Sequence, residues 1–268
     1  MIPNDALDTL FATWSSLDEL CAPLTEGQWK TPTACPGWSV QDVVSHLIDV
    51  ERKMLGLEPT THRSPPRDYV KNQFGESTEH EVDFRRSLTG AQVFAEWNEI
   101  VARRSTELRA GDDAYFAAPT MTPIGPGTVS GFLQLRILDC WIHEQDIRRA
   151  LNVRGHESGP AAEHTIDRLT RSLPMVIGKR VGTLDGESVH FLITGPVMRS
   201  LYLTVHDGRA AFVDLPPTYI RTGFSTDSNT FVELVAGRAT AEETASRWSA
   251  EGDTEHALRI AQNLNIMI

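Results

Sequence analysis

Apolar residues recur at helical spacing in four long segments of the first half of the chain. Positions three and four apart share one face of an α-helix, so this spacing indicates a helix with one buried side. Such helices are predicted over residues 3–20, 39–54, 91–108 and about 128–153. Residues 57–89 are polar and poorly periodic, and indicate a long connection with some helical pieces. Four helices with one long connection predict an α-helical bundle.

The second half of the chain changes from a helical to an alternating pattern. Residues 161–176 predict one more helix, after which apolar and polar residues alternate in four runs separated by turn residues. These runs are SVHFLITG, SLYLTVHDG, AAFVDLPP and TYIRTGF. Alternation predicts strands, and the Gly, Pro and Asp turns favour antiparallel pairing. With short helices over residues 229–234 and 254–264, this half reads as a small α+β domain.

The last helix of the predicted bundle carries a candidate for metal binding. Asp139 and His143 are four residues apart, so both lie on one face of the helix, one turn apart. A carboxylate and an imidazole placed in this way can bind a single metal ion. Arg136 and Asp146 fall on the same stripe, and charged residues on a buried helix are costly unless they are paired or functional. Charge pairs at this spacing also occur as ordinary surface decoration, so a third ligand would have to support the site.

The second predicted helix offers that third ligand. Ser39 and Asp42 have the spacing of a capping box, which predicts that the helix begins at this point. His46 follows among apolar residues, one turn beyond Asp42. A histidine on an apolar face is commonly a hydrogen-bonded core residue. A ligand pointing into a bundle would show the same pattern.

Composition and charge narrow the class of protein. The chain has 268 residues, enough for two domains, with 40% hydrophobic residues and a net charge of −11. The acidic balance disfavours nucleic acid or an anionic membrane as a partner. Three cysteines without CxxC spacing give no disulfide framework. We see no signal peptide and no membrane span, so a cytoplasmic protein is expected.

Two helical motifs carry a resemblance to a known family. The segments TPTACPGWSVQDVVSHLIDVE and RILDCWIHEQDIRRAL resemble the mycothiol-dependent maleylpyruvate isomerase family, within the DinB-like metalloenzyme superfamily. The segment FVELVAGRATAEE and the closing helix resemble the C-terminal domain of that family, which is sterol-carrier-protein-like. The resemblance implies a DinB-like four-helix bundle over residues 1–157 and an α+β domain over residues 158–268.

The resemblance also implies a divalent metal, usually zinc, and a ligand set. By position, the ligands are His46, Asp139 and His143, although the isomerase has Glu where this chain has Asp139. Two imidazoles and one carboxylate leave open positions, as in catalytic zinc sites. A thiol that enters an open position loses its proton and becomes a nucleophile. The expected function is therefore isomerisation or S-conjugation of a small electrophile by a metal-bound thiolate, with mycothiol as the thiol implied by the resemblance.

Other residues near these ligands have two readings each. Arg136 is a candidate catalytic residue that either pairs with Asp139 or holds a substrate carboxylate. Asp146 either orients a metal ligand or is an ordinary acidic residue of the helix. Asp42 either orients a metal ligand or only caps its helix. The remaining nearby residues are expected in the core: Trp38, Cys140 and Trp141.

Two other functions remain open at this stage. The chain could be a non-catalytic carrier of a small apolar ligand or lipid. It could also be a metalloenzyme without a thiol, because two histidines and one carboxylate form the facial triad of Fe(II) oxygenases. A monomer or a homodimer is expected in either case.

Overall fold

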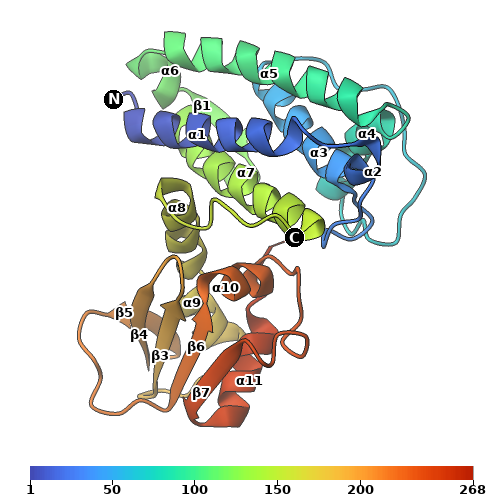
Figure 1. The fold of residues 1–268 in the computed structure, drawn as a ribbon. Helices are drawn as coiled ribbons and strands as arrows, with labels where there is room; N and C mark the ends of the chain where they lie inside the picture. The colour runs from blue at the N-terminus through green and yellow to red at the C-terminus, as the bar shows by residue number, and fades with distance from the viewer. Residues whose placement is uncertain (268) are drawn as a thin grey trace. The chain divides into compact units, whose positions relative to one another are not determined.

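The computed structural model describes residues 1–267, and the chain divides into two compact units, Met1–His156 and Glu157–Ile268. Helices dominate the first unit, whereas the second combines a sheet with helices (Figure 1). This mixed helix and sheet composition confirms the predicted fold class at that level. Ile268, which ends the predicted second domain, lies outside the described residues. Among residues 1–267, no helix combines the length and apolar character needed to cross a membrane.

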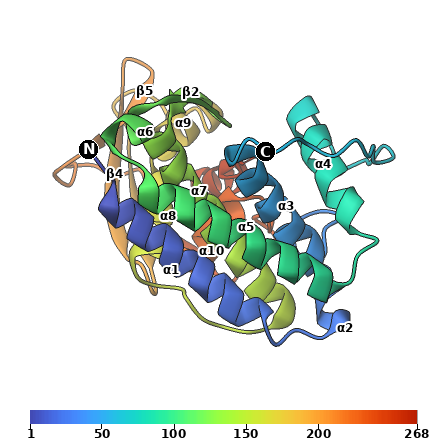
Figure 2. The same cartoon turned by 90° about the horizontal axis from the view of Figure 1, so that it is seen from above.

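Four long helices form the frame of the first unit. They are α1 (Asn4–Cys21), α3 (Val40–Met54), α5 (Gly90–Ala110) and α7 (Val129–Leu151). Helix α1 packs against α5 and α7, and α3 packs against the same two helices (Figure 2). All four correspond to segments predicted from apolar spacing. The assignment of this arrangement to the DinB-like bundle type stays a prediction.

Local chemistry explains where the site-bearing helices begin and end. The Ser39 hydroxyl accepts from the Asp42 backbone N–H, and the Asp42 carboxylate accepts from the Ser39 N–H at 2.8 Å, so α3 begins with the predicted capping box. The Thr128 hydroxyl caps α7 by accepting from the Gly131 N–H. Asn152 ends α7 in the left-handed conformation, with φ of 54°. The two helices that carry the candidate ligands are therefore fixed by their own sequence.

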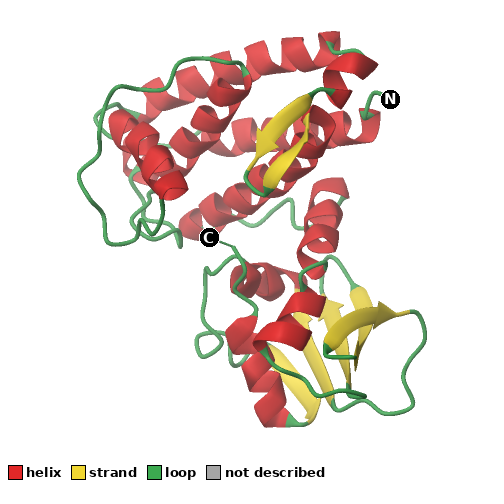
Figure 3. Cartoon of the chain, turned by 180° about the vertical axis from the view of Figure 1, so that it is seen from behind, coloured by secondary structure: helices red, strands yellow, loops and turns green. Residues whose placement is uncertain are grey.

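Several short elements of the first unit lie outside the four predicted helices. They are α2 (Glu26–Trp29), α6 (Asp113–Ala117) and the hairpin of β1 (Pro119–Thr122) and β2 (Gly125–Thr128), which contacts α7 (Figure 3). The predicted polar connection contains a full helix, α4 (Gln73–Arg85). Its Arg85 is buried and pairs with Glu96 at 2.8 Å and Glu81 at 3.3 Å. Helix α4 is held by ion pairs and not by a stripe of apolar residues, so the spacing of apolar residues did not predict its full length.

The second unit is a five-stranded sheet with helices packed on it. The strands are β3 (Ser188–Thr194), β4 (Arg199–His206), β5 (Arg209–Val213), β6 (Thr222–Asp227) and β7 (Trp248–Gly252), in the order β5-β4-β3-β6-β7. The helical segments are α8 (Pro160–Thr170), α9 (Leu173–Met175), a π-helical turn (Val176–Arg180), α10 (Ser228–Val235) and α11 (Thr254–Asn263). Phe191 of β3 packs on Phe224 of β6 and Phe231 of α10 in the core.

Two features of this sheet differ from the sequence prediction. Strand β6 pairs with β3 in parallel, because the chain crosses back past β4 and β5 to the other side of β3. The expectation of antiparallel pairing is therefore wrong for this pair, although it is correct for β3 with β4 and for β4 with β5. Strand β7 was not predicted, because its sequence WSAEG has little β-propensity and its register is set by pairing with β6.

Candidate metal centre

Three side chains from two helices converge in the first unit. His46 comes from α3, and Asp139 and His143 come from α7. Their ligand atoms all lie within 4.8 Å of one another. The Asp139 carboxylate lies 3.5 Å from His46 Nε2 and 3.6 Å from His143 Nε2. Ligands about 2.1 Å from a tetrahedral ion are separated by roughly 3.4 Å, so the spacing suits one metal ion.

The imidazole of His46 lacks a good hydrogen bond at either nitrogen. Its side chain is only 9% exposed, and Nδ1 has no hydrogen-bond partner within residues 1–267. Its Nε2 has only the 3.5 Å contact with Asp139. Burial lowers the pKa of His46, which favours the neutral form that binds metals. A buried imidazole without strong partners costs free energy unless a bound group satisfies it, so this residue fits a ligand role.

The Nδ1 nitrogen of His143 is hydrogen-bonded to a buried carboxylate. His143 Nδ1 lies 3.1 Å from Asp146 Oδ2, and the same oxygen accepts from the Cys35 thiol at 3.2 Å. Asp146 also pairs with Arg149 at 2.7 Å. This arrangement leaves Nε2 facing Asp139, as in metal sites where a carboxylate orients a histidine ligand. Cys35, His143 and Asp146 are themselves close enough to hold an ion, but hydrogen bonds already join them.

The charges of the site are strongly coupled. Burial lowers the pKa of His143, but hydrogen bonds to Asp146 and Cys35 outweigh that effect and raise it to about 10. Burial raises the pKa of Asp139, but the charge of Arg136 and the interactions with the two histidines hold it well below its ordinary value. Asp139 is therefore ionised, and a metal ion bound by His143 must displace a proton.

Arg136 is buried behind the Asp139 carboxylate. Its guanidinium donates to Asp139, to Glu51 Oε1 at 2.8 Å and to the Cys140 sulfur at 3.2 Å. Glu51 is also buried, and its second oxygen lies 3.3 Å from Arg104. With all three of its nitrogen atoms engaged, Arg136 is better suited to hold Asp139 than to hold a substrate carboxylate.

Trp38 lies beside the two histidines, although the sequence pattern favoured a core position. Its ring is 5.4 Å from the His46 ring and 6.3 Å from the His143 ring, and it is half-buried. Its indole N–H donates to Glu79 Oε2 at 3.1 Å. The available signal was its place immediately before the Ser39 cap, which fixes it at the beginning of α3. Trp38 therefore forms a wall of the candidate metal centre.

The other residues considered from sequence lie away from the ligand atoms. Asp42 caps α3 and pairs with Arg86 at 3.0 Å. Cys140 is fully buried, and burial raises the pKa of its thiol to about 12, which makes it a core thiol rather than a nucleophile. Trp141 is buried and donates to the backbone carbonyl of His156 at 2.8 Å.

Two histidines and one carboxylate on facing helices define a candidate mononuclear metal site of the open type. A family model described as the mycothiol maleylpyruvate isomerase N-terminal domain matches residues 10–148, slightly more than half of the chain. The chain belongs to this family, and the resemblance found in its two helical motifs is confirmed.

Solved structures and curated relatives extend the comparison. The crystal structure of the mycothiol-dependent maleylpyruvate isomerase is similar, with a TM-score of 0.60, 14% identity and 92% of each chain covered. A histidine-to-alanine variant of that enzyme gives a TM-score of 0.58 with 15% identity over the same share of both chains. Two uncharacterised proteins of Mycobacterium tuberculosis, MT0041 and Rv0036c, are 24% identical over 56% of this chain. The match spans 58% of the length of these relatives.

Proposed function

We propose that this chain is a metal-dependent enzyme that uses mycothiol to isomerise or S-conjugate a small electrophile. The observation that carries the proposal is the convergence of His46, Asp139 and His143 within 4.8 Å. Membership of the isomerase family supports a thiol-dependent reaction. The fold shared with the mycothiol-dependent isomerase is consistent with the same class of chemistry.

The residues around the candidate metal centre have separate roles in this proposed reaction. His46, Asp139 and His143 would hold a divalent metal, zinc by resemblance, which lowers the pKa of an incoming thiol so that the thiolate is available near neutral pH. Arg136 holds Asp139 in its ionised form, and Asp146 fixes the orientation of His143. Trp38 covers one side of both histidines and limits the access of water.

Metal analysis of the purified protein tests the site. About one equivalent of metal is expected for a single three-ligand site, and His46→Ala and His143→Ala should each lose it. His190→Ala is a suitable control, because His190 lies on β3 and belongs to none of the groups of described residues that are close enough together to hold an ion. Metal content that is unchanged in both site variants would contradict the proposal.

The fate of the thiol separates the two reactions. Isomerisation returns the thiol after each turnover, so free thiol stays constant while the electrophile is converted. S-conjugation consumes one thiol for each product molecule. Titration of free thiol during turnover by the metal-loaded protein therefore distinguishes the two outcomes.

The same preparation also tests the other two functions. A carrier protein would bind its ligand equally well without metal and would show no thiol-dependent turnover. A facial-triad oxygenase would contain iron and consume oxygen.

A further inference from the structure

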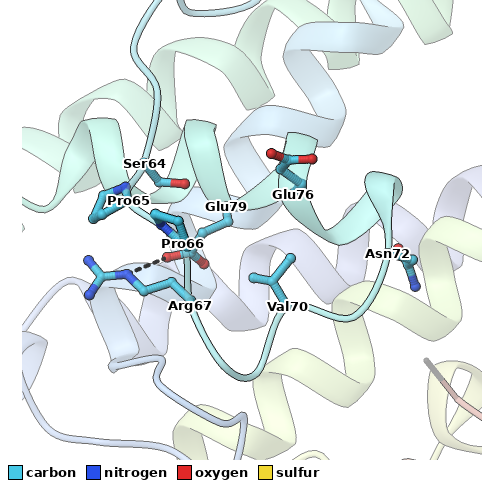
Figure 4. A pocket seen from close by; sticks show the side chains of 8 residues that line it. All are labelled: Ser64, Pro65, Pro66, Arg67, Val70, Asn72, Glu76 and Glu79. Atoms are coloured by element: carbon cyan, nitrogen blue, oxygen red, sulfur yellow. Dashed lines mark ion pairs between the residues drawn. The ribbon is translucent and has the colours of Figure 1, made fainter.

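A cavity of about 280 Å³ with a mixed polar and apolar lining lies beside α4 in the first unit. One side is the segment of residues 64–72, and the other is the first half of α4 (Figure 4). Two consecutive prolines stiffen the segment, which favours a preformed cavity. The side chains that matter for binding are Ser64, Arg67, Val70, Asn72, Glu76 and Glu79.

Glu79 connects this cavity with the candidate metal centre. It is 1% exposed, and its Oε2 accepts from the Trp38 indole N–H at 3.1 Å. Its Oε1 accepts from the Tyr69 hydroxyl at 2.8 Å and from Arg86 at 2.6 Å. The ring of Trp38 in turn lies 5.4 Å from the ring of His46, which is one of the candidate metal ligands. A single indole therefore lies between the cavity wall and the candidate metal ligands.

A second close contact fixes the loop that carries Trp38. Gly37 has φ of 75°, and a Cβ at this position would lie 2.2 Å from the Tyr69 ring. The ring of Tyr69 therefore packs directly on the backbone next to Trp38, while its hydroxyl binds Glu79. The cavity wall and the loop beside the metal ligands are thus joined by two independent contacts.

The charges of the cavity determine which ligand suits it. Arg67 is the lining cation, against the carboxylates of Glu76 and Glu79, and it is already paired with Asp83 at 3.0 Å. Glu79 is buried and compensated by Arg86, so the exposed carboxylate of Glu76 is the charge that a ligand meets, and it disfavours an anionic ligand. Carboxylates form strong hydrogen bonds with hydroxyl donors, so a neutral ligand rich in hydroxyl groups is favoured.

Arg67 supplies the donor of the cavity. Its Nε is closed to solvent and lies 3.8 Å from Glu79 Oε1, but the side chain as a whole is 36% exposed. A hydroxyl oxygen of a ligand can accept from the exposed part of the guanidinium. Val70 supplies an apolar surface of the kind that the C–H faces of a sugar ring contact.

We propose that this cavity binds the sugar and cyclitol part of the thiol cosubstrate, while its thiol end reaches the metal centre past Trp38. The inference rests on the proposed function, because mycothiol joins a cysteine to an aminosugar and an inositol. The charge of Glu76 disfavours a carboxylate-bearing electrophile in this cavity.

Isothermal titration of the metal-loaded protein with three ligands tests the assignment. The ligands are mycothiol, N-acetylcysteine as a thiol without sugar, and glucosaminyl-inositol as the sugar part without thiol. In Glu76→Gln, the affinities for mycothiol and glucosaminyl-inositol should fall about ten-fold, as expected for one lost charge-assisted hydrogen bond, while N-acetylcysteine binds as before. Glu99→Gln is the matched control, because the Glu99 side chain is 69% exposed on α5. Val70→Trp, which fills the cavity, should abolish binding of glucosaminyl-inositol.

The outcomes separate this inference from the proposed function. The cavity assignment is overturned if wild-type protein does not bind glucosaminyl-inositol, or if both cavity variants bind it with wild-type affinity. It is also overturned if the variants weaken N-acetylcysteine as much as mycothiol. If N-acetylcysteine binding is absent or independent of His143, but glucosaminyl-inositol binding depends on Glu76, the cavity assignment stands and the thiol-activating metal centre does not.

Discussion

Buried charges around α7 occur in pairs, and Arg136 takes part in two of them. It connects Glu51 of α3 with Asp139 of α7, and all three side chains are largely buried. Removal of one member of such a group leaves an uncompensated charge in a region of low dielectric.

Arg136→Met should therefore lower the free energy of unfolding by about 3–5 kcal/mol and weaken metal binding, because Glu51 and Asp139 lose their common cation. Urea denaturation and chelator competition measure the two effects. Arg85→Met is a matched control, since Arg85 is equally buried but pairs with Glu81 and Glu96, away from the metal ligands. If metal affinity is unchanged in both Arg136→Met and the milder Arg136→Lys, and KM rises instead, Arg136 binds a substrate carboxylate.

Asp146 acts through His143 rather than at the metal itself. It accepts from the Nδ1 side of His143 and from the Cys35 thiol. Asp146→Asn should reduce metal affinity about 10- to 100-fold, because the orientation and basicity of the histidine depend on its outer partner. The measurement is competition with a chromogenic chelator. Cys35→Ser keeps a hydrogen-bond donor at this point and should have a much smaller effect, and equal losses in the two variants would contradict this role.

At the scale of elements, helix starts are encoded locally. The capping box of Ser39 and Asp42 at α3 was predicted from a short stretch of sequence and is formed, and the structure adds a second box of Thr89 and Gln92 at α5 that was not predicted. Long amphipathic helices were also predictable, because each has an apolar stripe that needs no knowledge of its neighbour.

Ser39→Ala should lower the free energy of unfolding by about 1 kcal/mol, since the first turn of α3 loses its capping acceptor. Thr89→Ala at α5 provides the comparison and should cost a similar amount. Because His46 is about two turns beyond the cap, metal content should stay the same in both variants. A loss of metal in Ser39→Ala alone would mean that the cap also positions His46.

Elements stabilised by distant partners were harder to predict. Helix α4 has almost no apolar stripe and depends on pairs such as Arg85–Glu96. Strand β7 depends on its register with β6, and the parallel pairing of β3 with β6 depends on the path of the chain. None of these features is encoded in a short window of sequence.

At the scale of the whole molecule, a buried histidine makes stability depend on pH. In the second unit, His256 is buried between the hydroxyl groups of Thr183 and Thr222, at 2.8 Å and 2.9 Å. Burial lowers the pKa of His256 below its ordinary value of 6.5, and the charges of Arg221 and Arg259 act in the same direction. The folded unit therefore holds this histidine neutral.

The stability of the metal-free protein should fall as the pH is lowered below about 6.5, because the unfolded chain binds a proton that folded His256 does not. The full contribution is present above that pH and is lost as the pH falls toward the lower pKa of the folded state. Urea denaturation of the wild type and His256→Gln across this range tests it, and the variant should show a shallower pH dependence. Identical slopes would contradict the assignment.

The sequence by itself determined the long helices, the change from helical to alternating pattern and the one-turn spacing of Asp139 and His143. These are local properties, set by the 3.6-residue period of the helix and the two-residue period of the strand. Only the tertiary structure decided that His46 meets Asp139 and His143, that Trp38 covers them and that Glu79 joins the site to a cavity. Those contacts link residues tens of positions apart, and their distances depend on how helices pack, which no single segment of the chain encodes.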